Sequence, residues 1–136
     1  MAIERPGPMK LLLDTHVLLW AIDSPNLLSE GARSAILDER NELFASVASI
    51  WELTIKLQSG KLRLRMKLEQ FPRQLEMVGI SNYLPIGLFD VLELGRLPGI
   101  HEDPFDRMFV AQAKAGGFTV ITKDAFIHKY SIPVIW

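Results

Sequence analysis

Acidic residues follow two of the predicted strands, and acids in such positions can do chemistry. Asp14 ends the apolar run at residues 10–14, and Asp124 comes just after the run at residues 118–122. A carboxylate at the carboxyl end of a buried strand loses hydration unless it is paired or binds a metal ion. Each of these acids also has a second interpretation, in which its side chain caps the helix that follows.

A third acid, Glu52, lies in the middle of the helix predicted after Ser46. Apolar residues occur nearly all round this helix, which indicates that most of it is buried. A buried glutamate needs a partner, and a metal ion is one candidate. The alternative is an ion pair, since Glu52 and Lys56 are four residues apart in the favourable order.

Two further acids frame the sequence Asp-Pro-Phe-Asp at residues 103–106. Asp103 suits the N-cap of a helix, the proline suits the first helical position, and Asp106 then lies near the positive end of the helix dipole. Capping therefore explains Asp103 well. Asp106 shares its helix face with Val110 and Ala113, so it points along an apolar side and is the stronger candidate for chemistry.

One parallel sheet would bring these acids together. Strands and helices alternate along the chain, which predicts an α/β fold with helices on both faces of a mainly parallel sheet. Sites in such sheets form at the carboxyl ends of the strands. Converging carboxylates repel one another unless a hard divalent cation lies between them, and oxygen ligands suit Mg²⁺ or Mn²⁺. Such an ion can activate a water, so the predicted chemistry is phosphodiester hydrolysis.

The elements that must position the acids follow from hydrophobic spacing and turn residues. The predicted strands are 10–14, 43–45, 83–86, 118–122 and 133–136, and the predicted helices are 16–22, 30–40, 46–58, 67–78, 88–94, 103–115 and 125–130. Residues 62–64 fit either class. Residues 1–8 form a predicted irregular tail, and residues 9–136 form a single predicted domain.

The composition of the 136 residues excludes several other classes of protein. A hydrophobic fraction of 49% with 23% charged residues indicates a folded, water-soluble chain. The lack of cysteine excludes a disulfide scaffold and a thiolate zinc site, and the three histidines, His16, His101 and His128, lack the spacing of zinc ligands. No apolar run reaches the roughly 18 residues that cross a bilayer. The N-terminus resembles no secretory signal, so we expect a cytoplasmic location without membrane contact.

Positive charge is concentrated in one segment, although the net charge of the chain is −1. Residues 56–73 contain six basic residues and one acid, a local charge of +5. Such a segment favours contact with a phosphate backbone, and the alternatives are a solvated surface or a face for an acidic protein. The candidate substrate-binding residues are Lys56, Lys61, Arg63 and Arg65. Lys123 and Arg107 lie beside the acids in the sequence. Each of them could contact a phosphate or simply lie at the surface, and the sequence does not decide between these two interpretations.

Four segments of the chain together resemble the PIN domain, and their order and spacing are most similar to the VapC-type toxins of prokaryotic toxin–antitoxin pairs. The segments are LLLDTHVLLW at 11–20, SVASIWELTIK at 46–56, HEDPFDRMFVAQA at 101–113 and VITKD at 120–124. The resemblance extends from about residue 9 to residue 136. It implies a three-layer α/β/α fold and an endoribonuclease that depends on Mg²⁺ or Mn²⁺.

The resemblance also implies roles for particular residues and partners. The acids that match the family's metal ligands are Asp14, Glu52, Asp106 and Asp124. Asp103 is then a cap or an assisting acid, and Thr15 supplies a supporting hydrogen bond. The implied partners are an RNA substrate, a second copy in a homodimer, and a cognate antitoxin whose tail reaches into the active-site groove.

Three alternatives stay open at this point. A catalytically idle PIN-like module would only bind a protein partner, although the complete set of acids argues against it. A nuclease with the same metal chemistry would act on DNA, because both polymers offer the same phosphate. Phosphoryl transfer through an aspartyl intermediate needs a second acid two residues after Asp14, where His16 stands.

Overall fold

Five parallel strands form one sheet in the order β3-β2-β1-β4-β5. The structure is a computed structural model that describes residues 7–136. The strands are β1 (Lys10–Leu13), β2 (Glu42–Ser46), β3 (Asn82–Leu84), β4 (Thr119–Ile121) and β5 (Val134–Ile135). Leu12 of β1 aligns with Phe44 of β2 and with Val120 of β4. The predicted parallel sheet is therefore confirmed, with the first strand of the chain at its centre.

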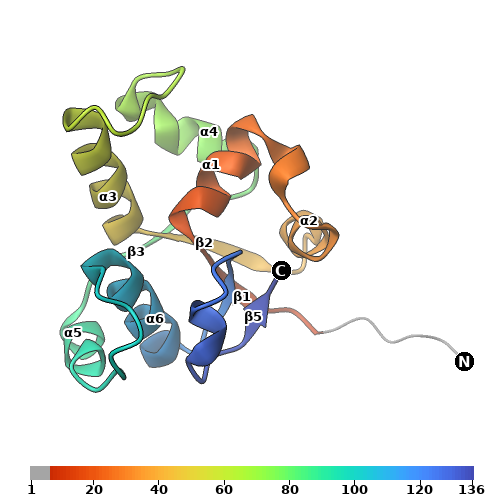
Figure 1. Ribbon diagram of the computed structural model, residues 1–136. Coiled ribbons are helices and arrows are strands. Elements are labelled where there is room, and N and C mark those ends of the chain that lie inside the picture. Colours follow the sequence, from red (N-terminus) through yellow and green to blue (C-terminus); the bar gives the residue numbers. More distant parts are fainter. Residues whose placement is uncertain (1–6) are drawn as a thin grey trace, which may run out of the picture.

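Helices cover both faces of this sheet. The α-helices are α1 (Thr15–Asp23), α2 (Glu30–Leu37), α3 (Val47–Gln58), α4 (Phe71–Met77), α5 (Leu88–Leu94) and α6 (Pro104–Gly116), and the short 3₁₀ helices are η1 (Pro25–Leu27), η2 (Leu68–Gln70) and η3 (Ile127–Lys129). Figure 1 shows α1 to α4 on one side of the sheet and α5 and α6 on the other. This is the three-layer α/β/α architecture that the sequence predicts.

The central strand is buried on both faces. Leu11, Leu12 and Leu13 have no exposed surface. Leu11 and Leu13 pack in the core below α1 to α4, whereas Leu12 packs in the second core with Phe109 of α6. Burying one leucine side chain contributes about 1.5–3 kcal/mol. Asp14 directly follows this strand, so its backbone is anchored by both cores.

Two predicted helices are shorter than the sequence indicates. The helix expected at 67–78 begins with the 3₁₀ turn η2, and its α-helical part starts only at Phe71. Pro72 explains the late start, because proline has no N–H to donate and fits only the first turn of an α-helix. The helix expected at 125–130 is only the 3₁₀ turn η3, where Ile127 N–H donates to the Asp124 carbonyl instead of opening an α-helix.

Other boundaries differ by a few residues. The helix predicted at 30–40 ends at Leu37, because the backbone of Asp38 is extended and its carboxylate lies 2.7 Å from the guanidinium of Arg40. The ambiguous residues 62–64 lie in no helix or strand. Of the predicted tail, residues 1–6 lie outside the described residues. Across residues 7–136, no helix is both long and apolar enough to cross a bilayer.

Candidate active site

A cleft of about 420 Å³ opens where β1 and β4 end. The order of the sheet reverses direction between these two strands, and such a switch point is where open α/β sheets place their sites. The backbone N–H of Asp14 donates to the Ile121 carbonyl at 3.0 Å, which ties the two strand ends together. All the candidate acids line this one cleft: Asp14, Glu52, Asp103, Asp106 and Asp124.

A buried threonine links the first and the last of these acids. Thr122 Oγ1 donates to Asp14 Oδ2 at 2.6 Å and accepts from the backbone N–H of Asp124 at 3.0 Å. Burial raises the pKa of Asp14, and the bond from Thr122 opposes that rise. Sequence reasoning missed Thr122, although its place in VITKD, two residues before Asp124, was a signal. The threonine sets the relative position of two candidate ligands.

Both carboxylate oxygens of Glu52 have partners. Thr15 Oγ1 donates to Oε1 at 2.8 Å, and the ammonium of Lys56 lies 2.9 Å from Oε2. The side chain is also buried, with 9% of Glu52 exposed. The hydrogen bond expected of Thr15 therefore goes to Glu52 in this structure. The ion pair with Lys56 forms as well, so Glu52 faces the cleft with its charge already balanced.

Asp103 and Asp106 have different surroundings, as the sequence indicates. Asp103 Oδ1 accepts from the backbone N–H of Phe105 at 2.7 Å and of Asp106 at 3.2 Å, so Asp103 is the N-cap of α6. Burial raises the pKa of Asp106 to about 6, and the nearby charges of Asp103, Asp14 and Asp124 add to the rise. This excess of negative charge is what a bound cation would relieve, so the donor set fits a divalent metal ion.

His101 joins this acidic cluster. Ligand atoms of His101, Asp106 and Asp124 all lie within 4.8 Å of one another. The Nε2 atom of His101 lies 3.1 Å from Asp124 Oδ2. Sequence reasoning set His101 aside because the histidines lack zinc-ligand spacing. The missed signal was its position two residues before Asp-Pro-Phe-Asp begins, in the same motif segment as Asp106.

The basic candidates are divided between the cleft and its surroundings. Lys56 and Lys123 line the cleft. The candidates Lys61, Arg63 and Arg65 lie outside its lining, in the segment that follows α3. The phosphate contacts of these five residues stay predictions.

The side chain of Arg107 is hydrogen-bonded to backbone carbonyls. Its guanidinium donates to the backbone carbonyls of Leu94 and Pro98, both at 3.1 Å, and of His101 at 3.4 Å. These three bonds connect α6 to the segment that precedes it. They favour a structural role for Arg107 over the phosphate contact that its place beside Asp106 left open.

The prediction that most of α3 is buried is wrong, because only Ala48, Ser49, Glu52 and Leu53 of this helix are buried. Val47, Trp51 and Ile55 are 45%, 57% and 41% exposed, so one apolar face of α3 points outward. The Trp51 ring packs edge-on against Phe105, with ring centroids 5.1 Å apart. The sequence has apolar residues on two sides of α3. One of these sides packs against the core, and the other lies at the surface.

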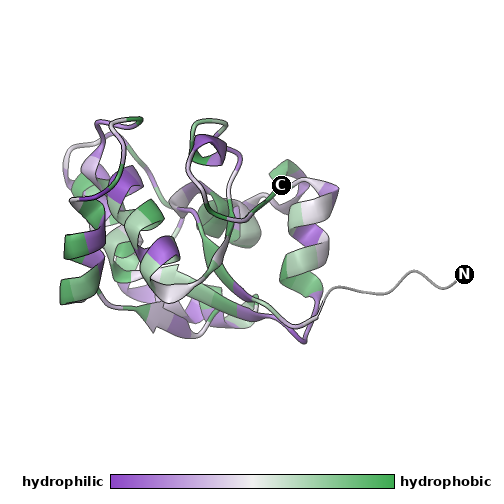
Figure 2. Cartoon of the chain, turned by 90° about the horizontal axis from the view of Figure 1, so that it is seen from below, coloured by the Kyte–Doolittle hydropathy of each residue, from purple (hydrophilic) through white to green (hydrophobic). Residues whose placement is uncertain are grey.

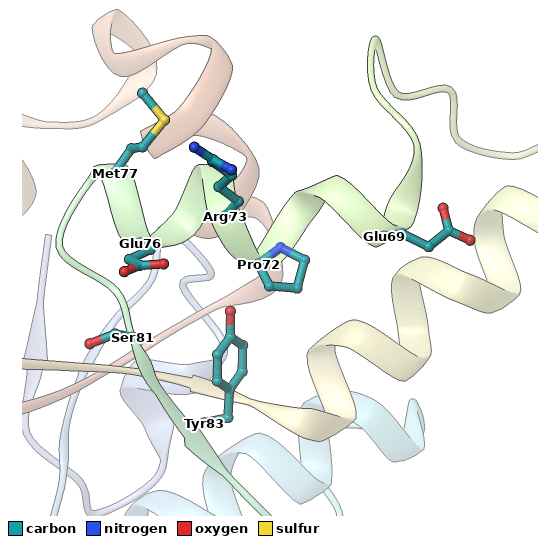
Figure 3. A pocket seen from close by; sticks show the side chains of 7 residues that line it. All are labelled: Glu69, Pro72, Arg73, Glu76, Met77, Ser81 and Tyr83. Atoms are coloured by element: carbon teal, nitrogen blue, oxygen red, sulfur yellow. The ribbon is translucent and has the colours of Figure 1, made fainter.

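A larger hollow lies elsewhere, beside the edge strand β3, and has a volume of about 880 Å³. Figure 3 shows its lining, which comes from η2, α4 and the segment around β3: Glu69, Pro72, Arg73, Glu76, Met77, Ser81 and Tyr83. The two glutamates lie apart in this view, and Tyr83 points toward Pro72 between them. Convergent carboxylates therefore favour the smaller cleft as the active site.

The sequence of the chain is similar to those of known proteins. Residues 11–132 match the family described as the PIN domain. The chain is 30% identical over 133 residues to Ribonuclease VapC22 of Mycobacterium tuberculosis (strain ATCC 25618 / H37Rv), an alignment that covers 93% of this chain and 98% of that protein.

Solved structures share the fold. The VapBC2 structure from Rickettsia felis, bound to a DNA fragment from their promoter, matches with a TM-score of 0.68 and 17% identity, over 93% of this chain and 97% of that chain. DNA-bound VapBC from Salmonella typhimurium matches with a TM-score of 0.63 and 18% identity, over 93% and 96% of the two chains. At these identities the structures show a common three-layer arrangement of sheet and helices.

Proposed function

This chain belongs to the PIN domain family, and from that premise we propose that it is an endoribonuclease that depends on Mg²⁺ or Mn²⁺. The observation that carries the proposal is the convergence of Asp14, Glu52, Asp106 and Asp124 on one cleft at the switch point of the sheet. The name of the 30% identical relative, Ribonuclease VapC22, supports RNA as the substrate.

The four acids would hold the metal ion, and other side chains would hold the acids. A bound divalent ion supplies a more acidic water and stabilises charge on the phosphate. Thr122 and Thr15 orient Asp14 and Glu52 through the hydrogen bonds described above. Lys123 also lines the cleft, where its ammonium would contact the phosphate backbone, whereas Lys56 is paired with Glu52.

We propose a cognate antitoxin as the protein partner, so that this chain is the toxin of a toxin–antitoxin pair. The fold neighbours that support this are VapBC structures from two bacteria. An antitoxin segment that occupies the cleft would cover its acids and prevent RNA from reaching them. Purifying the tagged chain from its own source and identifying any small protein that stays bound to it would test this pairing, and a chain that is always recovered alone would contradict it.

We also propose that two copies of the chain pair through apolar surface on α5 and α3. Leu88 and Phe89 of α5 are 71% and 77% exposed, and Trp51 of α3 is 57% exposed. Figure 2 shows hydrophobic residues along α5, at the left edge of the molecule. Large exposed apolar patches are rare on monomers. Sedimentation of the purified chain as a monomer would contradict the pairing.

The proposed activity is tested with purified protein, freed of any partner, on a mixed RNA pool in Mn²⁺. We expect cleavage that EDTA stops and that Asp14→Asn removes, because Asp14 is the acid anchored at the centre of the sheet. Circular dichroism would show that the variant is folded. Equal cleavage by Asp14→Asn would contradict the site, and matched DNA oligonucleotides would show whether RNA is preferred.

Binding of Mg²⁺ and Mn²⁺, measured by calorimetry, separates the enzyme from the alternative of an idle protein-binding module. A wild-type chain that binds neither ion and cuts no RNA would favour the module.

A further inference from the structure

We propose that His101 and Tyr130 form a positioning pair that fixes the carboxylate of Asp124. This inference rests on the proposed function, because Asp124 is a metal ligand only within that proposal. Three hydrogen bonds carry it: two between His101 and the Tyr130 hydroxyl, and one between His101 and Asp124.

The carboxylate of Asp124 determines that Nε2 of the His101 ring carries a proton, because an ionised carboxylate only accepts hydrogen bonds. Tyr130 Oη accepts the backbone N–H of His101 at 3.1 Å and also lies 3.1 Å from His101 Nδ1. In a neutral imidazole with its proton on Nε2, Nδ1 is an acceptor, and the Tyr130 hydroxyl donates to it. The opposite tautomer would direct a lone pair of Nε2 at the carboxylate, which is unfavourable. Nε2–H therefore donates to Asp124 Oδ2 at 3.1 Å.

The pair is held in place by burial and ring packing. Tyr130 is 4% exposed, and the side chain of His101 is 10% exposed. The two rings are stacked, with centroids 5.6 Å apart and planes 9° from parallel. The Phe126 ring meets the imidazole edge-on at 6.0 Å. Rotation of the imidazole would break both its stacking and its hydrogen bonds.

The Asp124 carboxylate is consequently held at both oxygens. Oδ2 accepts from His101, and Oδ1 accepts from the backbone N–H of Phe126 at 2.8 Å. An ionised carboxylate has about four acceptor positions, so two hydrogen bonds leave room for a metal ion. Partners that orient a ligand in this way commonly change metal affinity about 10–100-fold when removed. His101 thus orients the carboxylate of Asp124 for a metal ion, although the two residues are 23 positions apart in the sequence.

Two substitutions at residue 101 separate the contributions of the ring nitrogens. In His101→Gln the amide nitrogen occupies roughly the place of Nε2 and still donates to Asp124. In His101→Asn the amide reaches only the place of Nδ1, next to Tyr130, and stops short of the carboxylate. We expect His101→Asn to weaken binding of both Mn²⁺ and Mg²⁺ about tenfold or more, and His101→Gln to stay within about threefold of wild type.

The affinities are measured by titration calorimetry with the metal alone, so that RNA cleavage is a separate readout. His128→Asn is the matched control, because His128 is exposed on η3, and circular dichroism checks the fold of each variant. Wild-type affinity in His101→Asn would overturn the inference. Loss of Mn²⁺ binding in both variants with Mg²⁺ binding kept would also overturn it, because His101 would then be a ligand.

The position of the proton on the His101 ring is measured separately, by NMR. The ring ¹⁵N shifts of His101 in the metal-free protein should show the proton on Nε2, and Tyr130→Phe should leave it there, because the carboxylate of Asp124 still accepts it. An Nε2 atom without a proton in the wild-type protein would overturn the inference. A wild-type chain that binds metal in the expected pattern but cuts no RNA would contradict only the proposed function, whereas one that binds neither ion contradicts both.

Discussion

Glu52 and Asp106 face the same cleft from two different helices, but their surroundings are opposite. Glu52 has a threonine hydroxyl on one oxygen and a lysine ammonium on the other. Asp106 has three acids near it, and burial raises its pKa to about 6. The α3 wall of the cleft, formed by Glu52 and Lys56, is thus neutral without a metal ion. The α6 wall, formed by Asp103 and Asp106, carries excess negative charge. A bound metal ion, as proposed above, would therefore mainly compensate the negative charge of the α6 wall.

The largest expected effect is on cleavage and comes from the α6 wall. Asp106→Asn should lower metal-dependent RNA cleavage about 100-fold or more, the scale for loss of one preorganised electrostatic group. Asp103→Asn should lose less than about tenfold, because asparagine caps a helix as well as aspartate does. Initial rates at saturating Mn²⁺ measure both. Equal losses would mean that Asp103 assists the metal ion and does not only cap α6.

A smaller effect, on the free energy of unfolding, is expected at the α3 wall. Lys56→Met leaves the Glu52 carboxylate buried without its ammonium, so the free energy of unfolding in EDTA should fall by about 1–2 kcal/mol. Urea denaturation measures the change. Lys61→Met is the control, because Lys61 is exposed, and it should change stability by less than about 0.5 kcal/mol. A Lys56→Met protein as stable as this control would show that the wall is not balanced by the ion pair.

The smallest effect is the pH dependence of stability without metal. The pKa of Asp106 is about 6 in the folded chain and 3.8 when unperturbed, so the folded state binds more protons between these values. Stability in EDTA should therefore fall as the pH rises from 4 to 7. Because Asp106 is half-buried, its part should be about 1 kcal/mol. Asp106→Asn should remove this part and raise the melting temperature at pH 7. A stability curve identical to that of the wild type would contradict the crowding of the α6 wall.

The sheet and the gathering of the four acids at one cleft could be predicted from local patterns, whereas the binding of a metal ion by these acids stays a prediction. Buried strands are short apolar runs, and an acid that follows such a run must lie at the carboxyl edge of a parallel sheet. Thr122 and His101 could not be predicted in the same way. Their partners, Asp14 and Asp124, are 108 and 23 residues away, so only the folded chain reveals the contacts. The helical spacing of apolar residues also could not distinguish the core face of α3 from its exposed apolar face.

The bond between Thr122 and Asp14 has a consequence for the timing of activity during protein synthesis. A ribosome makes the chain from the N-terminus at about 5–20 residues per second, so the roughly 110 residues that separate Asp14 from Asp124 take about 5–20 s to make. Throughout that interval the first acid exists without the last one and without the threonine that holds it. A growing chain therefore cannot assemble its cleft until the ribosome has passed residue 124.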